Sequence, residues 1–335
     1  MPRSIQTVFA FSLALALIGA AGMQTASAQG ITVYNAQHDS LTKAWVAGFT
    51  KDTGIQVTVR NGSDSQLGNQ IVQEGAASPA DVFLTENSPA MALVDNAGLF
   101  APVDPATIAQ VAQAYRPSGK WIAIAARTTV FVYNTNKIKK AQLPKSLLDL
   151  QDATWKGRWG AAPAGADFQA IVSGLLELKG EDATLKWLQG MKANSTAFRG
   201  NGAVMQAVNA EQIDGGVIYH YYHFADQAKT GQNSKNTELH YFKNQDPGAF
   251  VSISGGGVLA SSKNQKDAQA FLKWVTGKGG QHVLRTGDSF EYAVGEGEAS
   301  HPNLVPLKDL DAPKVDPAKL NGKKVIQLMT QAGLL

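Results

Sequence analysis

Residues 31–59 read ITVYNAQHDSLTKAWVAGFTKDTGIQVTV and have the pattern of a strand, a helix and a second strand. Residues 31–35 form a short apolar run that predicts a buried strand. Ser40 is expected to cap the helix that follows. The apolar face of that helix has helical spacing and consists of Leu41, Ala44, Trp45 and Phe49. The helix should end at Asp52-Thr53-Gly54, after which residues 55–59 alternate as a second strand.

The alternation of strands and helices continues along the chain. A helix near residues 65–74 precedes a third strand at 80–84, and this order predicts a mostly parallel sheet with right-handed crossovers. The second half is expected to form another α/β region, with strands at 129–133, 159–162 and 215–219 and helices at 169–179 and 183–191. The last expected elements are an extended segment at 248–253, a helix at 265–277 and a terminal helix at 317–331.

The chain of 335 residues is longer than a single hydrophobic core usually supports, which suggests two lobes of about 150 residues each. No flexible linker separates them, so the chain is expected to cross between the lobes more than once, through segments such as 129–133 and 249–253. Gly255-Gly256-Gly257 follows an expected strand but lacks the dinucleotide-binding spacing, and is interpreted as tight backbone packing.

The composition excludes several classes of protein. The 30 basic and 27 acidic side chains are nearly balanced, which argues against a nucleic-acid-binding protein. The absence of cysteine excludes disulfide scaffolds, thiolate zinc sites and iron–sulfur clusters. The common phosphate-binding, serine-hydrolase and zinc-protease motifs are also missing, so no enzyme is indicated.

The N-terminal residues have the pattern of a signal peptide, expected to be 1–28. Arg3 gives a positive start, residues 8–22 are apolar, and Ala26-Ser27-Ala28 is a small-residue cleavage site. A secreted protein without cysteine or a lipid anchor fits the periplasm. The alternative is an uncleaved N-terminal anchor.

The most informative stretch is residues 219–224, YHYYHF, at the start of an expected helix. Neighbouring residues in a strand point to opposite faces, but at a strand-to-helix turn Tyr221 and Tyr222 could converge on one target. The alternatives are an aromatic patch packed between helices, or half a zinc site formed by His220 and His223, for which no further ligand is near in sequence.

The chain resembles the periplasmic ferric-ion-binding proteins, the solute-binding components of bacterial iron ABC transporters. The stretches that carry the resemblance are residues 31–38 (ITVYNAQH), residues 79–86 (PADVFLTE) and the pair Tyr221-Tyr222. Shorter supporting stretches follow in the same order, at 155–157, 245–249, 263–265 and 332–334.

This resemblance implies an α/β fold of two lobes joined by antiparallel hinge strands, a type II periplasmic binding protein with its ligand in the cleft. It implies Fe³⁺ ligation by His38, Glu86, Tyr221 and Tyr222. The lobes are expected to comprise residues 29–128 plus 252–300 and residues 129–251 plus 301–335. A role in iron transport and iron homeostasis follows, with an inner-membrane ABC permease and its ATPase as partners and with the binding protein itself monomeric.

The chemistry of these four residues suits a ferric ion. Fe³⁺ is a hard acid that prefers anionic oxygen, and it can displace the phenolic proton at neutral pH. Two phenolates and one carboxylate balance its three positive charges, while neutral His38 adds a ligand without charge. His38 and Glu86 follow expected strands, where open α/β sheets place their ligands. Two further donors, from water or a small anion, would complete an octahedron.

One loop departs from the best-known members of the resembled family, which hold a phosphate-like anion with hydroxyl groups. Here that loop is residues 163–167, without a hydroxyl and with the carboxylate of Asp167, which would repel phosphate. Asn87 and Asn201 remain suitable for contact with an anion. Arg127 could hold a planar anion, so carbonate is favoured over phosphate. Alternatively, Tyr219 could act as a third phenolate.

Two other functions stay open at this point. The first is a receptor of the same fold for an oxyanion, a polyamine or chelated iron. The second is a periplasmic enzyme, which would need a nucleophile–base pair or a metal with an open position.

Overall fold

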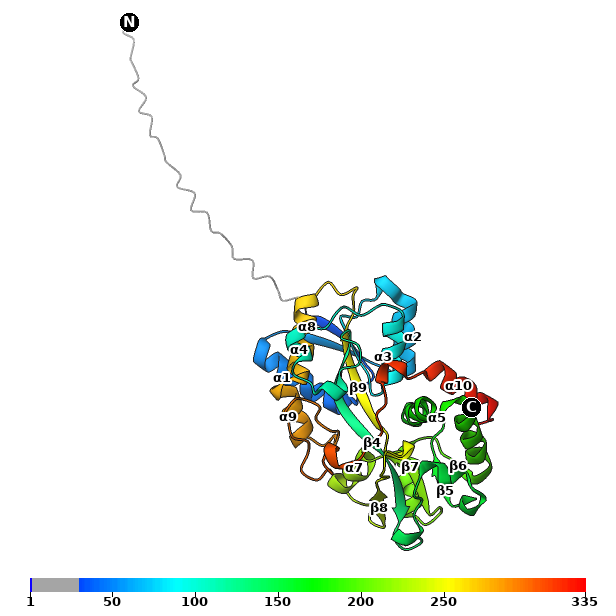
Figure 1. Ribbon diagram of the computed structural model, residues 1–335. Helices are drawn as coiled ribbons and strands as arrows, with labels where there is room; N and C mark the ends of the chain where they lie inside the picture. The colour runs from blue at the N-terminus through cyan, green and yellow to red at the C-terminus, as the bar shows by residue number, and fades with distance from the viewer. Residues whose placement is uncertain (2–29) are drawn as a thin grey trace.

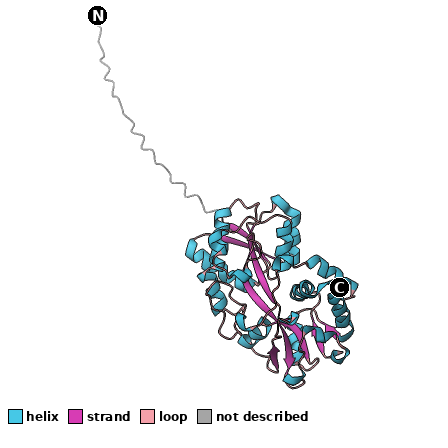
Figure 2. Cartoon of the chain, viewed as in Figure 1, coloured by secondary structure: helices cyan, strands magenta, loops and turns pink. Residues whose placement is uncertain are grey.

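The computed structural model describes Met1 and residues 30–335, which form two α/β lobes (Figure 1). Apart from Met1, the predicted signal peptide lies outside the described residues. Within the described part of the chain, no helix has the length and apolar character needed to cross a membrane. Strands run through the centre of each lobe and helices cover them (Figure 2).

A nine-stranded sheet connects the two lobes, in the order β2-β1-β3-β9-β4-β7-β5-β6, with β8 added at the side of β4. Its strands are β1 (Ile31–Asn35), β2 (Val57–Asn61), β3 (Val82–Leu84), β4 (Ile122–Asn134), β5 (Trp159–Ala161), β6 (Ser195–Ala197), β7 (Gly215–Tyr219), β8 (Thr237–His240) and β9 (Val251–Val258). In one lobe β1 pairs in parallel with β2 and β3, and in the other β5 pairs in parallel with β6 and β7.

The lobes are joined by the antiparallel pair β4 and β9, which runs diagonally through Figure 1. Residues 122–128 of β4 pair with β9, whereas residues 129–134 pair with β7 and β8 of the other lobe. This arrangement confirms the predicted two-lobe α/β fold with antiparallel connecting strands.

The helices follow the strands in the α/β order. They are α1 (Asp39–Thr53), α2 (Asp64–Glu74), α3 (Ser88–Asn96), α4 (Pro105–Ile108), α5 (Ala166–Asn194), α6 (Asn201–Asn209), α7 (Tyr221–Lys229), α8 (Gln265–Thr276), α9 (Lys278–Thr286) and α10 (Gly322–Gln331). Helices α8 and α9 pack against α1, and α10 packs against α5 and also contacts α3.

Several predicted boundaries were wrong. Helix α1 begins at Asp39 after an N-cap at His38, so Ser40 lies inside its first turn. Ala44 is exposed and so does not belong to the buried face of this helix. Thr42 is buried instead, because its hydroxyl donates to Asn35 Oδ1 at 2.8 Å. The two helices expected at 169–179 and 183–191 are confirmed as the two halves of α5, which are separated at Gly180, whose φ is 79°.

Two later segments also differ from the prediction. Residues 247–249 form a 3₁₀ turn, and the strand begins only at Val251. The expected helix at 317–331 is a 3₁₀ turn over 317–319 followed by α10, which Asn321 caps by accepting from the backbone of Lys324 at 3.0 Å.

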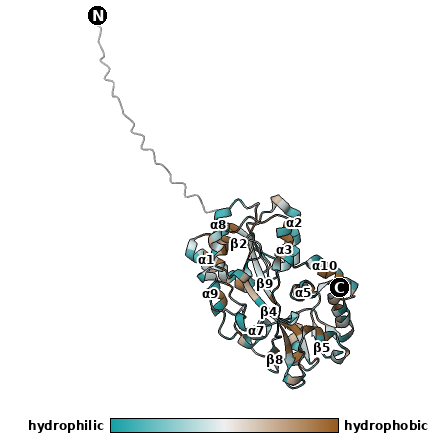
Figure 3. Ribbon diagram, viewed as in Figure 1, coloured by the Kyte–Doolittle hydropathy of each residue, from teal (hydrophilic) through white to brown (hydrophobic). Residues whose placement is uncertain are grey.

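The main core cluster extends through both lobes, and a smaller one packs between α6 and the strands β4 and β7. Figure 3 shows hydrophobic residues on the inner strands and hydrophilic ones on outer helices such as α2. Phe49 of α1 meets Phe271 of α8 edge to face, with ring centroids 5.1 Å apart. The glycines of β9 confirm the packing interpretation: a Cβ at Gly255 would lie 2.3 Å from the Met91 side chain, and one at Gly257 would lie 2.6 Å from the Phe100 ring.

Candidate metal centre

The four predicted ligands meet between the lobes because each follows the end of a strand. His38 follows β1 and Glu86 follows β3; these strands are parallel neighbours, so both side chains emerge at the same edge of the sheet. Tyr221 and Tyr222 are the first residues of α7, directly after β7 and the intervening His220. The two lobes therefore present these side chains to one another.

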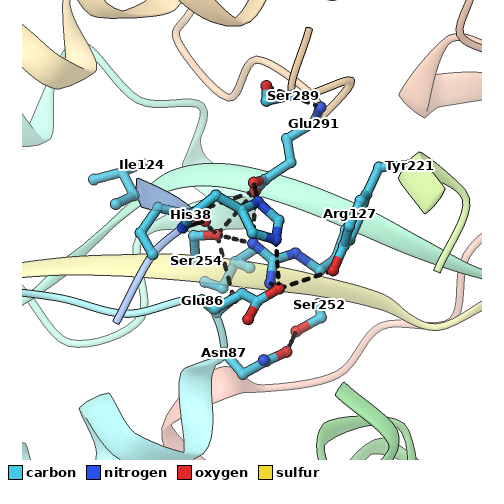
Figure 4. A network of polar contacts seen from close by, with 12 residues as sticks. His38, Glu86, Asn87, Ile124, Arg127, Tyr221, Ser252, Ser254, Ser289 and Glu291 are labelled. Carbon is cyan, nitrogen blue, oxygen red and sulfur yellow. Dashed lines mark hydrogen bonds and ion pairs between the residues drawn. The ribbon is translucent and has the colours of Figure 1, made fainter. Parts of the chain in front are cut away.

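Glu86 is the meeting point of this cluster, as Figure 4 shows. Its Oε1 atom lies 3.0 Å from His38 Nε2 and 2.8 Å from the Tyr221 hydroxyl. Tyr221 stacks on Tyr222 with ring centroids 4.4 Å apart, so the consecutive tyrosines converge as the turn geometry predicted. The structure thus brings all four predicted ligands into one site.

Asp167 is a fifth member that the sequence reasoning did not assign as a ligand. Its Oδ2 atom lies 3.0 Å from the Tyr221 hydroxyl and 3.1 Å from that of Tyr222. Asp167 is the second residue of α5, which follows β5, a parallel neighbour of β7. The same strand-end rule that located Glu86 beside His38 could have located Asp167 beside the tyrosines.

Asn87 and Asn201, the residues expected to contact an anion, both donate to the protein's own carboxylate of Asp167, and Asn87 also donates to Asp64. Asn87 donates to Asp167 Oδ1 at 3.1 Å, and Asn201 donates to Asp167 Oδ2 at 2.9 Å. A cavity of about 120 Å³ adjoins Asp167 at the starts of α5 and α6. Its lining includes Glu86, Asp167 and Tyr222, and it has room for a few water molecules.

Arg127 lies at the centre of the site on β4, fully buried, with its guanidinium group directed at protein carboxylates. Its Nη2 atom lies 2.6 Å from Glu291 Oε2, and its Nη1 atom lies 3.3 Å from Glu86 Oε1. Glu291 is itself fully buried and was missed by the sequence reasoning, because no motif marks it. The fork that was expected to hold carbonate therefore already faces two carboxylates.

Tyr219 lies next to the pair Tyr221 and Tyr222 and is completely buried. Its ring centroid lies 6.3 Å from the ring centroid of Tyr221. The guanidinium carbon of Arg127 lies 5.8 Å from the centroid of the Tyr219 ring. Among residues 30–335, no hydrogen bond joins its hydroxyl to His38, Glu86 or Asp167. Tyr219 thus stays a predicted alternative ligand that lies outside the hydrogen bonds joining Glu86, Asp167 and Tyr221.

Burial and charge hold protons on several of these groups. Burial and the nearby carboxylates of Asp167 and Glu86 raise the pKa of Tyr221 and of Tyr222 well above 10.0. Burial lowers the pKa of His38, but hydrogen bonds to Glu291 and Glu86 outweigh this effect and raise it to about 10.

The carboxylates of the site are shifted in different directions. Burial and the charge of Glu86 raise the pKa of Asp167 to about 6. Burial acts in the same direction on Glu291, but the charges of Arg127 and His38 outweigh it and lower that pKa to about 2. At neutral pH the site therefore holds carboxylates beside protonated phenols and imidazole, and a cation that replaces those protons would find anionic oxygen.

Residues 77–320 match the family model of the bacterial extracellular solute-binding proteins. A relative from Serratia marcescens, named Fe(3+)-binding periplasmic protein, is 72% identical over 325 residues, which cover 96% of each chain. The chain belongs to the bacterial extracellular solute-binding protein family.

Further relatives agree with this membership. A Neisseria meningitidis protein named major ferric iron-binding protein is 36% identical over 334 residues, covering 98% of this chain and 100% of that one. The crystal structure of iron-bound HitA from Pseudomonas aeruginosa superposes with a TM-score of 0.84 at 39% identity, covering 91% of this chain and 99% of that one.

Proposed function

We propose that this solute-binding protein carries Fe³⁺ between its lobes, with His38, Glu86, Asp167, Tyr221 and Tyr222 as protein ligands. One observation carries the proposal: oxygen atoms from both lobes converge on the Tyr221 hydroxyl, which lies 2.8 Å from Glu86 Oε1 and 3.0 Å from Asp167 Oδ2. His38 Nε2 joins the same cluster, at 3.0 Å from Glu86 Oε1.

The charges of this ligand set suit a trivalent hard cation. Two phenolates and two carboxylates would surround Fe³⁺ with anionic oxygen, and a neutral imidazole would add one nitrogen. The buried pair of Arg127 and Glu291 adds no net charge. A divalent cation would leave a larger excess of negative charge in a buried site, which is unfavourable, and a softer cation would suit oxygen ligands less well.

Water is proposed as the remaining ligand, in place of carbonate or phosphate. The cavity next to the site is lined by the carboxylates of Glu86 and Asp167, which repel an anion. Asn87 and Asn201 are engaged by Asp167, and the guanidinium group of Arg127 faces Glu86 and Glu291. The same carboxylates argue against an oxyanion as the transported solute.

The resemblance to the ferric-ion-binding proteins and the names of the relatives support the role of an iron carrier for this chain. We infer a periplasmic monomer that delivers Fe³⁺ to an inner-membrane ABC permease and its ATPase, after removal of a signal peptide at residues 1–28, and that catalyses no reaction. The proposed lobes are 29–128 plus 252–300 and 129–251 plus 301–335. In support, β4 changes its pairing partner from β9 to β7 between Thr128 and Thr129.

The test is a titration of the purified protein with ferric nitrilotriacetate in buffer free of phosphate and bicarbonate. Ferric phenolates absorb visible light, so a coloured complex of one ion per chain is expected. The variant combining Tyr221→Phe with Tyr222→Phe should lose both the colour and tight binding. Tyr133→Phe is the matched control, because that hydroxyl also contacts a carboxylate, Glu238 at 2.6 Å, outside the site. Wild-type binding by the double variant would refute the proposal.

A further inference from the structure

The Glu291 carboxylate contacts the side of His38 that faces away from the proposed metal ligands (Figure 4). Its Oε1 atom lies 2.9 Å from His38 Nδ1, while Nε2 on the other side of the ring lies 3.0 Å from Glu86 Oε1. We propose that Glu291 is a positioning residue that keeps the proton of His38 on Nδ1 and thereby turns the Nε2 lone pair toward the ferric ion. This inference rests on the proposed function.

The chemistry of imidazole requires such a partner. A histidine that binds a metal must be neutral, so one ring nitrogen carries the proton and the other carries the lone pair. A carboxylate that accepts from the protonated nitrogen fixes the tautomer and the ring orientation and strengthens the metal-binding nitrogen as a base. Glu291 is placed for this role because it contacts only the nitrogen that points away from Glu86.

Glu291 is itself held by a buried set of donors. Its Oε2 atom lies 2.6 Å from Arg127 Nη2, 3.2 Å from the Ser254 hydroxyl and 3.3 Å from Gln37 Nε2. These contacts leave Oε1 for His38. The amide oxygen of Gln37 accepts from the backbone N–H of His38 at 2.7 Å, so the backbone and the ring of His38 are tied to the same cluster.

The backbone next to Glu291 is strained, which indicates that the surroundings impose its position. Phe290 has a φ of 52°, a value that bulky residues rarely adopt. Tyr292 exchanges two backbone hydrogen bonds with Ala126 of β4, at 3.0 and 2.8 Å. His220, which directly precedes Tyr221, contacts the Phe290 carbonyl through Nε2 at 2.8 Å. The turn carrying Glu291 is thus anchored to the strand that joins the lobes and to the start of the tyrosine pair.

A simpler role for Glu291 would be to neutralise Arg127, which is also fully buried. That role accounts for the contact through Oε2 but not for the contact between Oε1 and His38. The two roles predict different outcomes when the glutamate is changed in the presence and in the absence of the histidine.

The first experiment is a double-mutant cycle of Glu291→Gln and His38→Ala, with affinity measured by competition with nitrilotriacetate for Fe³⁺. Glutamine keeps the shape and an oxygen acceptor but removes the charge. Each single change should weaken binding by about 10- to 100-fold. The double variant should bind no more weakly than His38→Ala alone, because Glu291 acts through His38. Losses that multiply, or wild-type affinity of a folded Glu291→Gln variant, would overturn the proposal.

The second experiment needs no variant and so does not depend on how Glu291→Gln folds. Protein with ¹⁵N-labelled histidine is loaded with Ga³⁺, a diamagnetic ion with the charge of Fe³⁺, and examined by NMR. His38 should show a proton on Nδ1 and none on Nε2; the opposite tautomer would overturn the proposal. If the tyrosine double variant loses iron binding while Glu291→Gln keeps the wild-type affinity for Fe³⁺, this inference alone is rejected. If the wild-type protein binds no iron, the proposed function is rejected.

Discussion

Loading the protein with Fe³⁺ should release about three protons per ion near pH 8, because ligands must be deprotonated to bind a metal. The pKa of His38 is raised to about 10, and those of Tyr221 and Tyr222 are raised well above 10.0, so all three groups hold a proton at that pH. The pKa of Asp167 is raised only to about 6, so this ligand is already ionised.

The proton count sets the size and the sign of the pH effect. Each proton displaced changes the affinity about tenfold per pH unit, so three protons give about a thousandfold, or about 4 kcal/mol. All three groups have raised pKa values in the metal-free protein, so acid opposes binding and affinity falls as the pH falls. Below about pH 6 the dependence should become steeper, because Asp167 then also holds a proton.

The assay is calorimetric titration with ferric nitrilotriacetate in several buffers with different ionisation enthalpies, which yields the number of protons released. The contribution of the chelator is measured separately and subtracted. Competition with the chelator across one pH unit then gives the change in affinity independently.

Variants identify which groups supply the protons. Tyr222→Phe should reduce the count by about one, because one phenol is removed while Tyr221 remains. Tyr133→Phe removes a hydroxyl that contacts Glu238 outside the site and should leave the count unchanged. A wild-type count of one or less, or an equal decrease in both variants, would show that the two tyrosines do not bind as phenolates.

Three further predictions follow from the same geometry. Arg127→Ala should destabilise the fold by about 3 kcal/mol in urea unfolding, because it removes the buried cation that pairs with Glu291 Oε2 and leaves His38 to balance that carboxylate. A loss below about 1 kcal/mol would contradict the pairing of Arg127 with Glu291. Small-angle scattering should show a more compact molecule after addition of Fe³⁺, since ligands from both lobes favour the closed state. If the apo protein is open and its dimensions do not change when Fe³⁺ is added, a site between the lobes would be contradicted. Removing phosphate and bicarbonate should change the affinity for Fe³⁺ by less than about twofold, whereas Asp167→Asn should reduce it by more than about tenfold. A strong dependence on either anion would indicate that an external anion, and not Asp167, binds the ferric ion.

The sequence alone determined the local elements and the residues most closely tied to them. The apolar run of β1, the helical spacing of Trp45 and Phe49, and the order of strands and helices depend on neighbours within a few turns of the chain. His38 and Glu86 are identified through the resemblance to the ferric-ion-binding proteins, and their positions directly after two such strands fit that assignment. The tyrosine pair is identified through the same resemblance, because residues 219–224 by themselves also fit an aromatic patch.

How distant residues complete the site depends on the packing of the two lobes. The pattern predicted a strand at 129–133, but pairing with β9 extends β4 back to Ile122 through alanine residues that have no strong preference of their own. Asp167 lies 54 positions from Tyr221, and Glu291 lies 253 positions from His38. Such contacts arise from the packing of whole lobes, which local propensity does not encode, and a buried carboxylate reads in the sequence like an exposed one until its partners are known.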